Sequence, residues 1–270
     1  MPSSPTHSRK RGTYAVAGAW LCHAGRVRKA NEDACVIGTA VSARDSEVPT
    51  RLALDGESWL AAVSDGIGGH RAGAEASHEV ATALAQCARL TPTGIRDTLQ
   101  RVNRRLCDRG RRDPERAAMG ATVAGIAYGG KGLFAFSVGD SRVYRYGRQR
   151  FTQVTRDDSE AEELMRAGLL PRDGSVRPGF MHALTQAIGG RDYIVEIRPH
   201  LYPLSVATRA RFLICTDGVT DMLPASAIEE ILAQENDPAA AVALLFHLAM
   251  DAGGVDNITL AILDVEKSGA

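Results

Sequence analysis

Short apolar runs, each bounded by Gly, Asp or Asn, dominate the chain. They are rich in Val, Ile, Phe and Tyr, which fit the pleated surface of a strand, and the bounding residues favour turns. Strands are predicted at residues 14–22, 34–40, 59–64, 121–128, 132–138, 142–147, 195–202, 211–216 and 258–263. The sequence YGGKG at 128–132 predicts a hairpin between two of these runs.

Apolar residues at helical spacing predict two pairs of helices. The first pair covers about 72–89 and 95–109, and the second covers 224–234 and the segment from Asp237 to Gly253. In that last helix Asp suits the N-cap, the following Pro the first helical position, and Gly the C-terminal stop. A further short helix is predicted at 159–168, inside a Gly- and Pro-rich insertion.

Strands that follow strands and helices that come in pairs favour an α+β fold. We expect a central antiparallel β-sandwich flanked by pairs of helices, in the layer order α-β-β-α. A parallel βαβ fold would require strict alternation of strand and helix, which the pattern lacks. We expect a single domain over residues 13–266, with a flap at about 155–191 and a disordered basic tail at 1–12.

Composition narrows the classes of partner. The chain of 270 residues has 32 Lys and Arg against 32 Asp and Glu, so no net charge attracts nucleic acid or an acidic membrane surface. No apolar run has the length of a signal peptide core or a membrane span. The five cysteines are widely spaced and form no C-x-x-C pair. These features favour a cytoplasmic monomer with no nucleic-acid or membrane partner.

Acidic residues stand at the ends of five predicted strands. They occur in the sequences Asn31-Glu32-Asp33, Asp65-Gly66, Gly139-Asp140, Asp217-Gly218 and Asp256-Asn257. One such sequence alone is typical of a turn, because Asp bonds to its own backbone and Gly accepts a positive φ. In a sandwich, however, the loops gather at two rims, so carboxylates from distant parts of the chain can converge. Carboxylates brought together raise one another's pKa unless cations neutralise them.

The donor set favours hard cations. Aspartates, backbone carbonyls and water are the usual ligands of Mg²⁺, Mn²⁺ and Ca²⁺. Two such ions ~3.5–4 Å apart activate a bridging water and stabilise an in-line displacement at phosphorus. Arg28, just upstream of the first acidic sequence, is suited to bind a phosphate through its guanidinium fork. The residues therefore predict metal-dependent hydrolysis of a phosphate ester.

A series of motifs in a fixed order resembles one known family. The motifs are V-R-x-x-N-E-D (27–33), V-S-D-G-I-G-G-H (63–70), G-A-T (120–122), V-G-D-S-R-V-Y (138–144), L-T-Q-A-I-G (184–189), C-T-D-G-V-T-D (215–221) and D-N-I-T (256–259). This order resembles the PPM-type metal-dependent serine/threonine protein phosphatases, of the protein phosphatase 2C kind in their bacterial form. The resemblance covers about residues 14 to 265 and agrees with the predicted sandwich.

The resemblance implies a role for each principal residue. Asp65 would bridge two metal ions, and the carbonyl of Gly66 would bind the first of them. Asp217 and Asp256 would complete the second metal, and Arg28 would hold the substrate phosphate. The implied reaction is hydrolysis of phosphoserine or phosphothreonine in phosphoprotein substrates by a metal-activated water, in opposition to a bacterial serine/threonine kinase.

Further residues carry supporting roles by the same resemblance. Asp33 and Glu32 would act on a metal through bound water. Asp140, with Asp217, resembles the ligands of a third, weaker site beside the two principal Mn²⁺ or Mg²⁺ ions. His70 and Asn257 are further candidates for a supporting role or for the general acid. For His70 we favour a polar residue at a helix start, because an acid must reach the ester oxygen.

Three positions depart from the family pattern. Ile67 stands where larger eukaryotic members carry a histidine that is a proposed general acid. The usual D-H-S at the start of the flap is Asp157-Asp158-Ser159, and the usual G-T-T has Ala121 in the middle. None of these changes removes a metal ligand. They bear on protonation of the leaving group and on the flap.

Three other classes have weaker support. Residues 22–28 fit the C-x-x-G-x-x-R pattern of cysteine-dependent phosphatases, but no helix pattern follows the Arg, so we expect Cys22 to pack as a small hydrophobic residue. An inactive member of the family would have lost metal ligands, which are all present. A nucleic-acid binder would rest on one basic run that is typical of a solvated helix end. That run contains Arg101, Arg104, Arg105, Arg109, Arg111 and Arg112.

Overall fold

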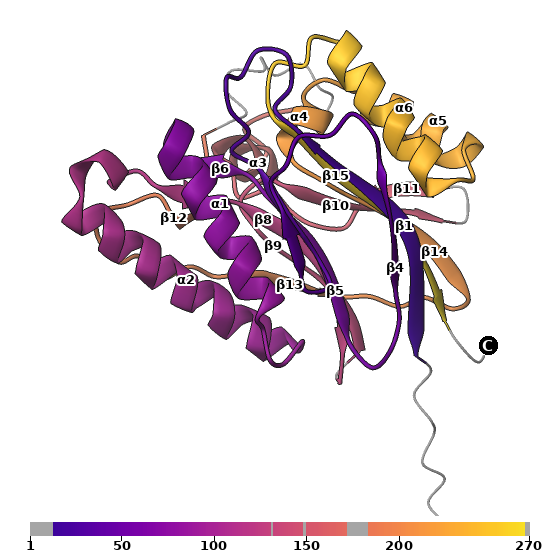
Figure 1. Cartoon of the computed structure of the whole chain (residues 1–270), viewed down its shortest axis with the longest axis horizontal. Helices are drawn as coiled ribbons and strands as arrows, with labels where there is room; N and C mark the ends of the chain where they lie inside the picture. The colour runs from indigo at the N-terminus through magenta and orange to yellow at the C-terminus, as the bar shows by residue number, and fades with distance from the viewer. Residues whose placement is uncertain (1–12, 131, 148–149, 172–182, 268–270) are drawn as a thin grey trace, which may run out of the picture.

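Two six-stranded antiparallel sheets pack face to face, and helices cover the outer face of each (Figure 1). The structure, a computed structural model, describes residues 13–130, 132–147, 150–171 and 183–267. The arrangement confirms the predicted α-β-β-α sandwich. The predicted tail at 1–12 and the middle of the predicted flap lie outside the described residues.

The first sheet contains strands from both ends of the described chain. Its order is β11-β10-β14-β15-β1-β4, and β1 pairs with β15 over their whole length. These strands are β1 (Tyr14–His23), β4 (Thr50–Leu54), β10 (Arg142–Gly147), β11 (Arg150–Gln153), β14 (Arg209–Cys215) and β15 (Ile258–Lys267).

The second sheet has the order β13-β9-β8-β5-β2-β3, and a small third sheet has the order β12-β7-β6. The larger sheet contains β2 (Ala34–Ile37), β3 (Ala40–Ser42), β5 (Trp59–Ser64), β8 (Val123–Gly129), β9 (Gly132–Val138) and β13 (His200–Pro203). The small sheet contains β6 (Gly66–Ile67), β7 (Gly120–Ala121) and β12 (Ile188–Gly189). The predicted hairpin is confirmed, since β8 and β9 pair up to Gly129 and Gly132.

Helices pack against the outer faces of the sandwich. The helices are α1 (His70–Ala85), α2 (Pro92–Arg112), α3 (Glu160–Arg166), α4 (Asp217–Thr220), α5 (Ala225–Gln234) and α6 (Pro238–Asp251), with a 3₁₀ turn at Pro114–Arg116. Leu99, Val102 and Leu106 of α2 are fully buried in the core that α1 and α2 form with the second sheet. Leu245 and Phe246 of α6 are buried in the matching core on the first sheet. Among the described helices, none has the length and apolar character of a membrane span.

One predicted strand is largely wrong. The run 195–202 forms a strand only at His200–Pro203. The preceding residues bond to side chains in place of a neighbouring strand: Asn103 donates to the carbonyl of Val195, and Gln186 bonds to both the N–H and the carbonyl of Arg198. The patterns also missed the strands β4 and β11, the two-residue strands of the small sheet and the short helix α4.

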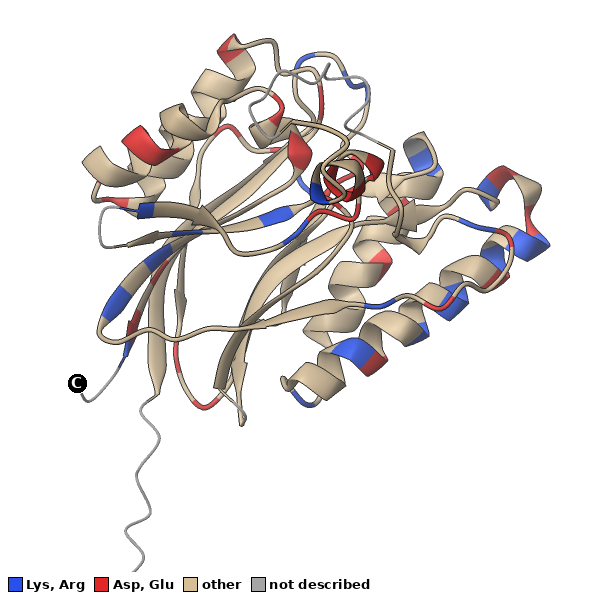
Figure 2. Cartoon of the chain, turned by 180° about the vertical axis from the view of Figure 1, so that it is seen from behind, with Lys and Arg blue, Asp and Glu red and all other residues tan. Residues whose placement is uncertain are grey.

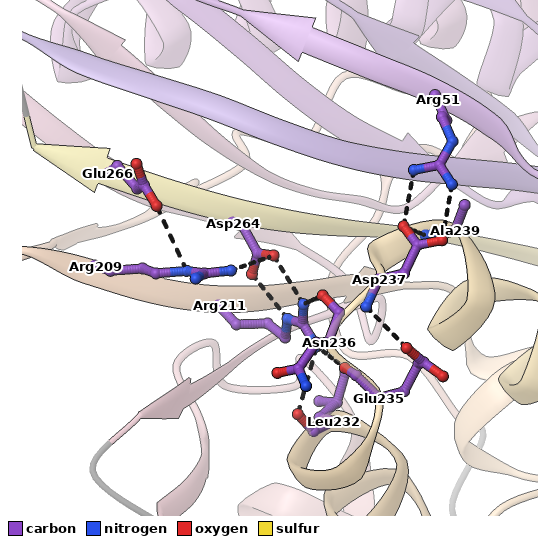
Figure 3. Close-up of polar contacts among 10 residues, drawn as sticks. All are labelled: Arg51, Arg209, Arg211, Leu232, Glu235, Asn236, Asp237, Ala239, Asp264 and Glu266. Carbon is purple, nitrogen blue, oxygen red and sulfur yellow. Dashed lines mark hydrogen bonds and ion pairs between the residues drawn. The ribbon is translucent and has the colours of Figure 1, made fainter.

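A buried arginine fixes the C-terminal end of α5 to the first sheet (Figure 3). Arg211 of β14 donates from Nε and Nη2 to the two carboxylate oxygens of Asp264 on β15, each at 2.7 Å. The same guanidinium donates to the backbone carbonyls of Leu232, Glu235 and Asn236. These carbonyls, at the end of a helix, have no partner within the helix, so the arginine satisfies them.

The next helix is attached to the same sheet by its N-cap. Asp237 caps α6 by accepting from the N–H of Ala239, which confirms the predicted cap (Figure 3). Both of its carboxylate oxygens also accept from the guanidinium of Arg51 on β4, each at 2.7 Å. Two arginines of one sheet therefore contact the two covering helices, Arg211 from a buried position and Arg51 from an exposed one.

We expect Arg211→Met to lower the free energy of unfolding by about 3–5 kcal/mol, because it leaves Asp264 buried without its main counter-charge. Arg209 is the matched control, since it bonds to the same carboxylate but is 57% exposed. Arg209→Met should cost less than about 1 kcal/mol. Urea unfolding of the two variants measures the difference, and equal losses would contradict the assignment.

Candidate active site

A cavity of about 470 Å³ lies at one rim of the sandwich, where loops of both large sheets meet. The predicted site residues that line it are Arg28, Glu32, Asp65, Gly66, Asp140, Asp217, Asp256 and Asn257. Two predicted residues are placed differently: Asp33 is buried beside the cavity, only 1% exposed, and the side chain of His70, the first residue of α1, lies outside the described residues. The structure thus brings together carboxylates that are up to 224 positions apart, from Glu32 to Asp256.

Thr122 joins two of the acidic loops. Its N–H donates to the carbonyl of Asp65 at 2.9 Å, and its hydroxyl accepts from the N–H of Asp65 at 3.1 Å. The hydroxyl also lies 2.7 Å from that of Ser141, next to Asp140. The end of β5 is therefore held against the loop after β9. The G-A-T motif contains Thr122, but the bond of Thr122 to Ser141 could not be predicted from the sequence.

Two glycines let the helix α1 approach the cavity. A Cβ at Gly66 would lie 2.3 Å from the carbonyl oxygen of Gly73, and a Cβ at Gly73 would lie 2.1 Å from a carboxylate oxygen of Glu32. Any larger residue at either position would push the helix away from the acidic loops. The sequence prediction missed Gly73, because it lies in an alanine-rich run that is ordinary for a helix interior.

Asn257 clamps the loop that carries Arg28. Its Nδ2 donates to the carbonyls of Ala24 and Ala30, on either side of the arginine, at 2.9 and 3.0 Å. Its Oδ1 accepts from the N–H of Glu32 at 2.8 Å. Asn257 is 4% exposed, and its side-chain amide makes three hydrogen bonds to the backbone. Asn257 therefore positions the loop. An amide also has no proton suited to general acid catalysis.

Arg28 points to the acidic cluster from this loop. Its Nη2 donates to Oδ2 of Asp256 at 2.7 Å, and this bond raises the pKa of the guanidinium. The side chain is 52% exposed, so it lies at the mouth of the cavity with part of its fork open to solvent. A guanidinium in this position can donate hydrogen bonds to a phosphate that enters from solvent.

The carboxylates share a strongly unfavourable environment. Burial, and then the charge of Asp217, raise the pKa of Asp33 to about 7 and that of Asp140 to about 7. The pKa of Asp65 is raised well above its usual range by loss of solvation and by Asp33 and Asp217. Thr216 donates to one oxygen of Asp33 at 2.9 Å. The other oxygen, Oδ1, is buried without a hydrogen-bond partner among the described residues.

These observations fit a site for hard cations. A buried oxygen without a donor and several carboxylates of raised pKa are what cation ligands show when no cation is bound. Within the described ranges, no three His, Cys, Asp or Glu side chains are already grouped closely enough to hold a metal ion. Mutual repulsion favours the separation of the carboxylates from one another. Asp256 bonds to Arg28. The assignment of individual ligands stays a prediction.

Asp158, in place of the usual histidine, connects the flap to the Asp140 loop. Its Oδ2 accepts from the N–H of Gly139 at 3.0 Å and from Nε2 of Gln186 at 2.8 Å. Its Oδ1 lies 2.8 Å from Nε2 of His200 on β13. This chain thus has a carboxylate on the flap and a histidine on the neighbouring strand. The pair is 42 positions apart, so the sequence could not indicate it.

The structure rules out the cysteine-dependent alternative. Cys22 is a fully buried residue of β1 whose sulfur accepts from Asn31 and from Thr259, each at 3.0 Å. Burial, together with the charge of Asp33, raises the pKa of its thiol to about 12, so a reactive thiolate is not formed. Cys22 therefore packs as predicted from the strand pattern.

The basic run lies on α2, where acidic residues are interspersed (Figure 2). Arg105 and Arg109 both pair with Glu79 of α1, and Arg111 pairs with Asp108. Part of this charge therefore joins the two helices, in agreement with the prediction of a solvated helix end.

Comparison with known proteins identifies the family. Residues 50–245 match the family described as Protein phosphatase 2C. The Serine/threonine phosphatase stp of Listeria monocytogenes is 28% identical over 249 residues, which cover 89% of this chain and 92% of that protein. Protein phosphatase PhpP of Streptococcus pneumoniae is 30% identical over 220 residues, which cover 77% of this chain and 86% of that protein.

A solved structure extends the likeness to the fold. The catalytic domain of the serine threonine protein phosphatase PstP, in complex with two manganese ions, is 27% identical, with a TM-score of 0.76. The match covers 94% of this chain and 100% of that one. The chain belongs to the protein phosphatase 2C family, as the order of its motifs predicted.

We expect the stability of the metal-free protein to fall as the pH rises from about 4 to about 7, because of the buried carboxyls. The pKa of Asp33 and of Asp140 is about 7 in the folded protein against 3.8 for an ordinary aspartate, so in this window the folded state binds more protons than the unfolded chain. The stabilisation from proton binding is complete below the lower value and is lost as the pH passes the higher one.

Urea unfolding in EDTA across this pH range measures the effect. The double variant Asp33→Asn, Asp140→Asn is the control, since it removes both titrations. Its free energy of unfolding should fall less steeply with pH than that of the wild type, and parallel curves would show that the two carboxyls do not titrate as described.

Proposed function

We propose that the protein hydrolyses phosphoserine and phosphothreonine in protein substrates with the help of two Mn²⁺ or Mg²⁺ ions. The observation that carries the proposal is the convergence of five acidic loops on one cavity with Arg28 at its mouth. Membership of the protein phosphatase 2C family and the names of the relatives support the choice of substrate. The two manganese ions in the related PstP structure support the metal requirement.

The ligand roles follow the motifs. Asp65 and the carbonyl of Gly66 would hold the first ion, with Asp65 shared by the second, which Asp217 and Asp256 complete. Such ions supply an activated water and neutralise charge on the phosphate. Asp33 and Glu32 would orient bound water from the buried side of the cluster. A third, weaker site would use Asp140 with Asp217.

Arg28 would bind and orient the phosphate. Its partner in the structure is Asp256, one of the proposed ligands. Occupation of that carboxylate by a cation would leave the guanidinium available for two phosphate oxygens. Because the clamp of Asn257 fixes the backbone on both sides, the arginine reaches the phosphate from a defined direction.

Water is the nucleophile in this proposal, so no phosphoenzyme forms. The bond between phosphorus and the seryl or threonyl oxygen breaks, and that oxygen must gain a proton. Ile67 lines the cavity, and its side chain has no acidic proton. Glu32 and His70 are the neighbouring residues with the right chemistry for this step.

The setting of the enzyme is part of the proposal. We place it in the cytoplasm as a monomer that opposes a serine/threonine kinase, with a single catalytic domain over residues 13–266 and a flap at about 155–191. The bacterial relatives and the single sandwich support this setting.

We expect hydrolysis of p-nitrophenyl phosphate to require Mn²⁺ or Mg²⁺ and to stop in EDTA. Asp65→Ala should lower kcat/KM more than about 100-fold, because it removes a carboxylate shared by both ions. It should also weaken Mn²⁺ binding in calorimetry. Asp55→Ala, at an exposed aspartate near the same strand, is the control. If Asp65→Ala and the wild type are equally active, the proposal fails.

Arg28→Ala should lower kcat/KM for a phosphopeptide by roughly 10- to 100-fold, the loss expected for a charged hydrogen bond to the phosphate. Arg26 is a close control: it lies in the same loop, is 53% exposed and pairs with Asp251 at 3.0 Å. Arg26→Ala should change kcat/KM by less than about twofold. Steady-state kinetics of both variants test the role, and similar losses for the two arginines would argue for a general effect of charge.

A further inference from the structure

A second cavity lies beside the acidic one. It has a volume of about 380 Å³, within the range of about 300–1,000 Å³ that is usual for ligand sites. Ile67 and Leu184 line both cavities, so the two adjoin at these side chains. The small sheet places Ile67 there, because β6 begins at Gly66 on the acidic side and ends at Ile67.

The lining of the second cavity is mainly apolar. Its apolar side chains are Ile67, Ala118, Leu184, Ala187, Val195 and Ile197. Ile197 is 3% exposed and forms part of the floor, whereas Val195 is 41% exposed and lies at the edge. An apolar side chain placed in this cavity would lose contact with water on several sides.

The lining also has four polar side chains. Thr185 and Glu196 are exposed, and Gln186 and Arg191 are engaged in contacts with neighbouring residues. Gln186 donates to Asp158 and accepts from the N–H of Arg198 at 2.6 Å. Arg191 lies over the ring of Tyr193 and donates to its hydroxyl at 3.3 Å. Two polar side chains are thus engaged and the other two lie at the surface, so the interior is better suited to an apolar group than to a polar one.

An exposed apolar strip continues from the cavity edge. Tyr193, Ile194 and Val195 are consecutive and 55%, 56% and 41% exposed. Asn103 holds this segment to α2 through the carbonyl of Val195 at 2.6 Å. Adjoining apolar residues that stay exposed on a fixed backbone are typical of a surface that contacts another polypeptide.

We propose that the second cavity binds an apolar side chain of the protein substrate, two residues from the phosphoserine or phosphothreonine. This inference rests on the proposed phosphatase activity. In an extended polypeptide, alternate side chains point to the same face and are about 6.6 Å apart. A substrate whose phosphate enters the acidic cavity therefore directs its next same-face side chain across Ile67 and Leu184.

Phosphoserine peptides that differ at one position test the proposal. One set carries Leu, Ser or Glu two residues before the phosphoserine, and a second set carries them two residues after it. We expect the wild type with Mn²⁺ to prefer Leu over Ser by about tenfold in kcat/KM in one of the two sets. Equal values for Leu and Ser in both sets would overturn the proposal.

Variants at the cavity edge locate the preference. Val195→Asp should reduce the ratio of Leu to Ser to less than about twofold, and Val195→Lys should turn the preference toward Glu. Ile194→Asp is the matched control, since Ile194 is a neighbouring exposed apolar residue outside the cavity lining. It should keep the wild-type ratio. A ratio that survives Val195→Asp, or that Ile194→Asp removes equally, would overturn the assignment to this cavity.

Different results would contradict the phosphatase activity and the apolar site. If the wild type hydrolyses p-nitrophenyl phosphate and all peptides at equal rates, the phosphatase assignment stands and the apolar site is wrong. If it hydrolyses neither p-nitrophenyl phosphate nor any peptide with Mn²⁺, the proposed function is wrong and the apolar site falls with it.

Discussion

Repulsion among the carboxylates at the rim of the sandwich is the constraint on which the site depends. Asp33 is buried near Asp217 and Asp256, so the charges cannot be solvated by water as they would be on a surface. Two features relieve the repulsion: protonation, which the raised pKa of the buried carboxyls favours, and the bond from Arg28 to Asp256. Both are reversible. In the proposed function, a cation at Asp256 would free the arginine, so metal binding and phosphate binding would be coupled through one side chain.

The scaffold around these charges is made of neutral groups. Thr122 joins the loops of Asp65 and Asp140, and Thr216 bonds to Asp33 and to the N–H of Thr259. Asn257 does the same for the loop of Arg28. Hydroxyls and amides fix the backbone without adding to the charge of the cluster.

The sequence could predict the features that depend on local pattern. Alternating apolar runs bounded by turn residues predicted most strands, and Asp beside Gly at their ends predicted that carboxylates would gather at a rim. The features it could not predict join residues that are far apart. His200 meets Asp158 across 42 positions, and Arg211 closes a helix that begins 14 positions later, at Ala225. Residues 195–199 have strand composition, yet side chains from α2 and the flap take their backbone bonds.

Ile67 lies where the acidic cavity and the apolar cavity adjoin. By the resemblance of the motifs, this position corresponds to the histidine that is a proposed general acid in larger eukaryotic members of the family. Here the side chain lines both the acidic cavity and the apolar one, and it has no polar atom. A charged or hydrogen-bonding residue at this point would bring water and polarity to the boundary between the two cavities. The isoleucine instead presents an apolar side chain to both cavities. In the proposed binding of substrate, this position would contribute to the fit of the polypeptide that carries the phosphate, and another residue of the site would protonate the leaving oxygen.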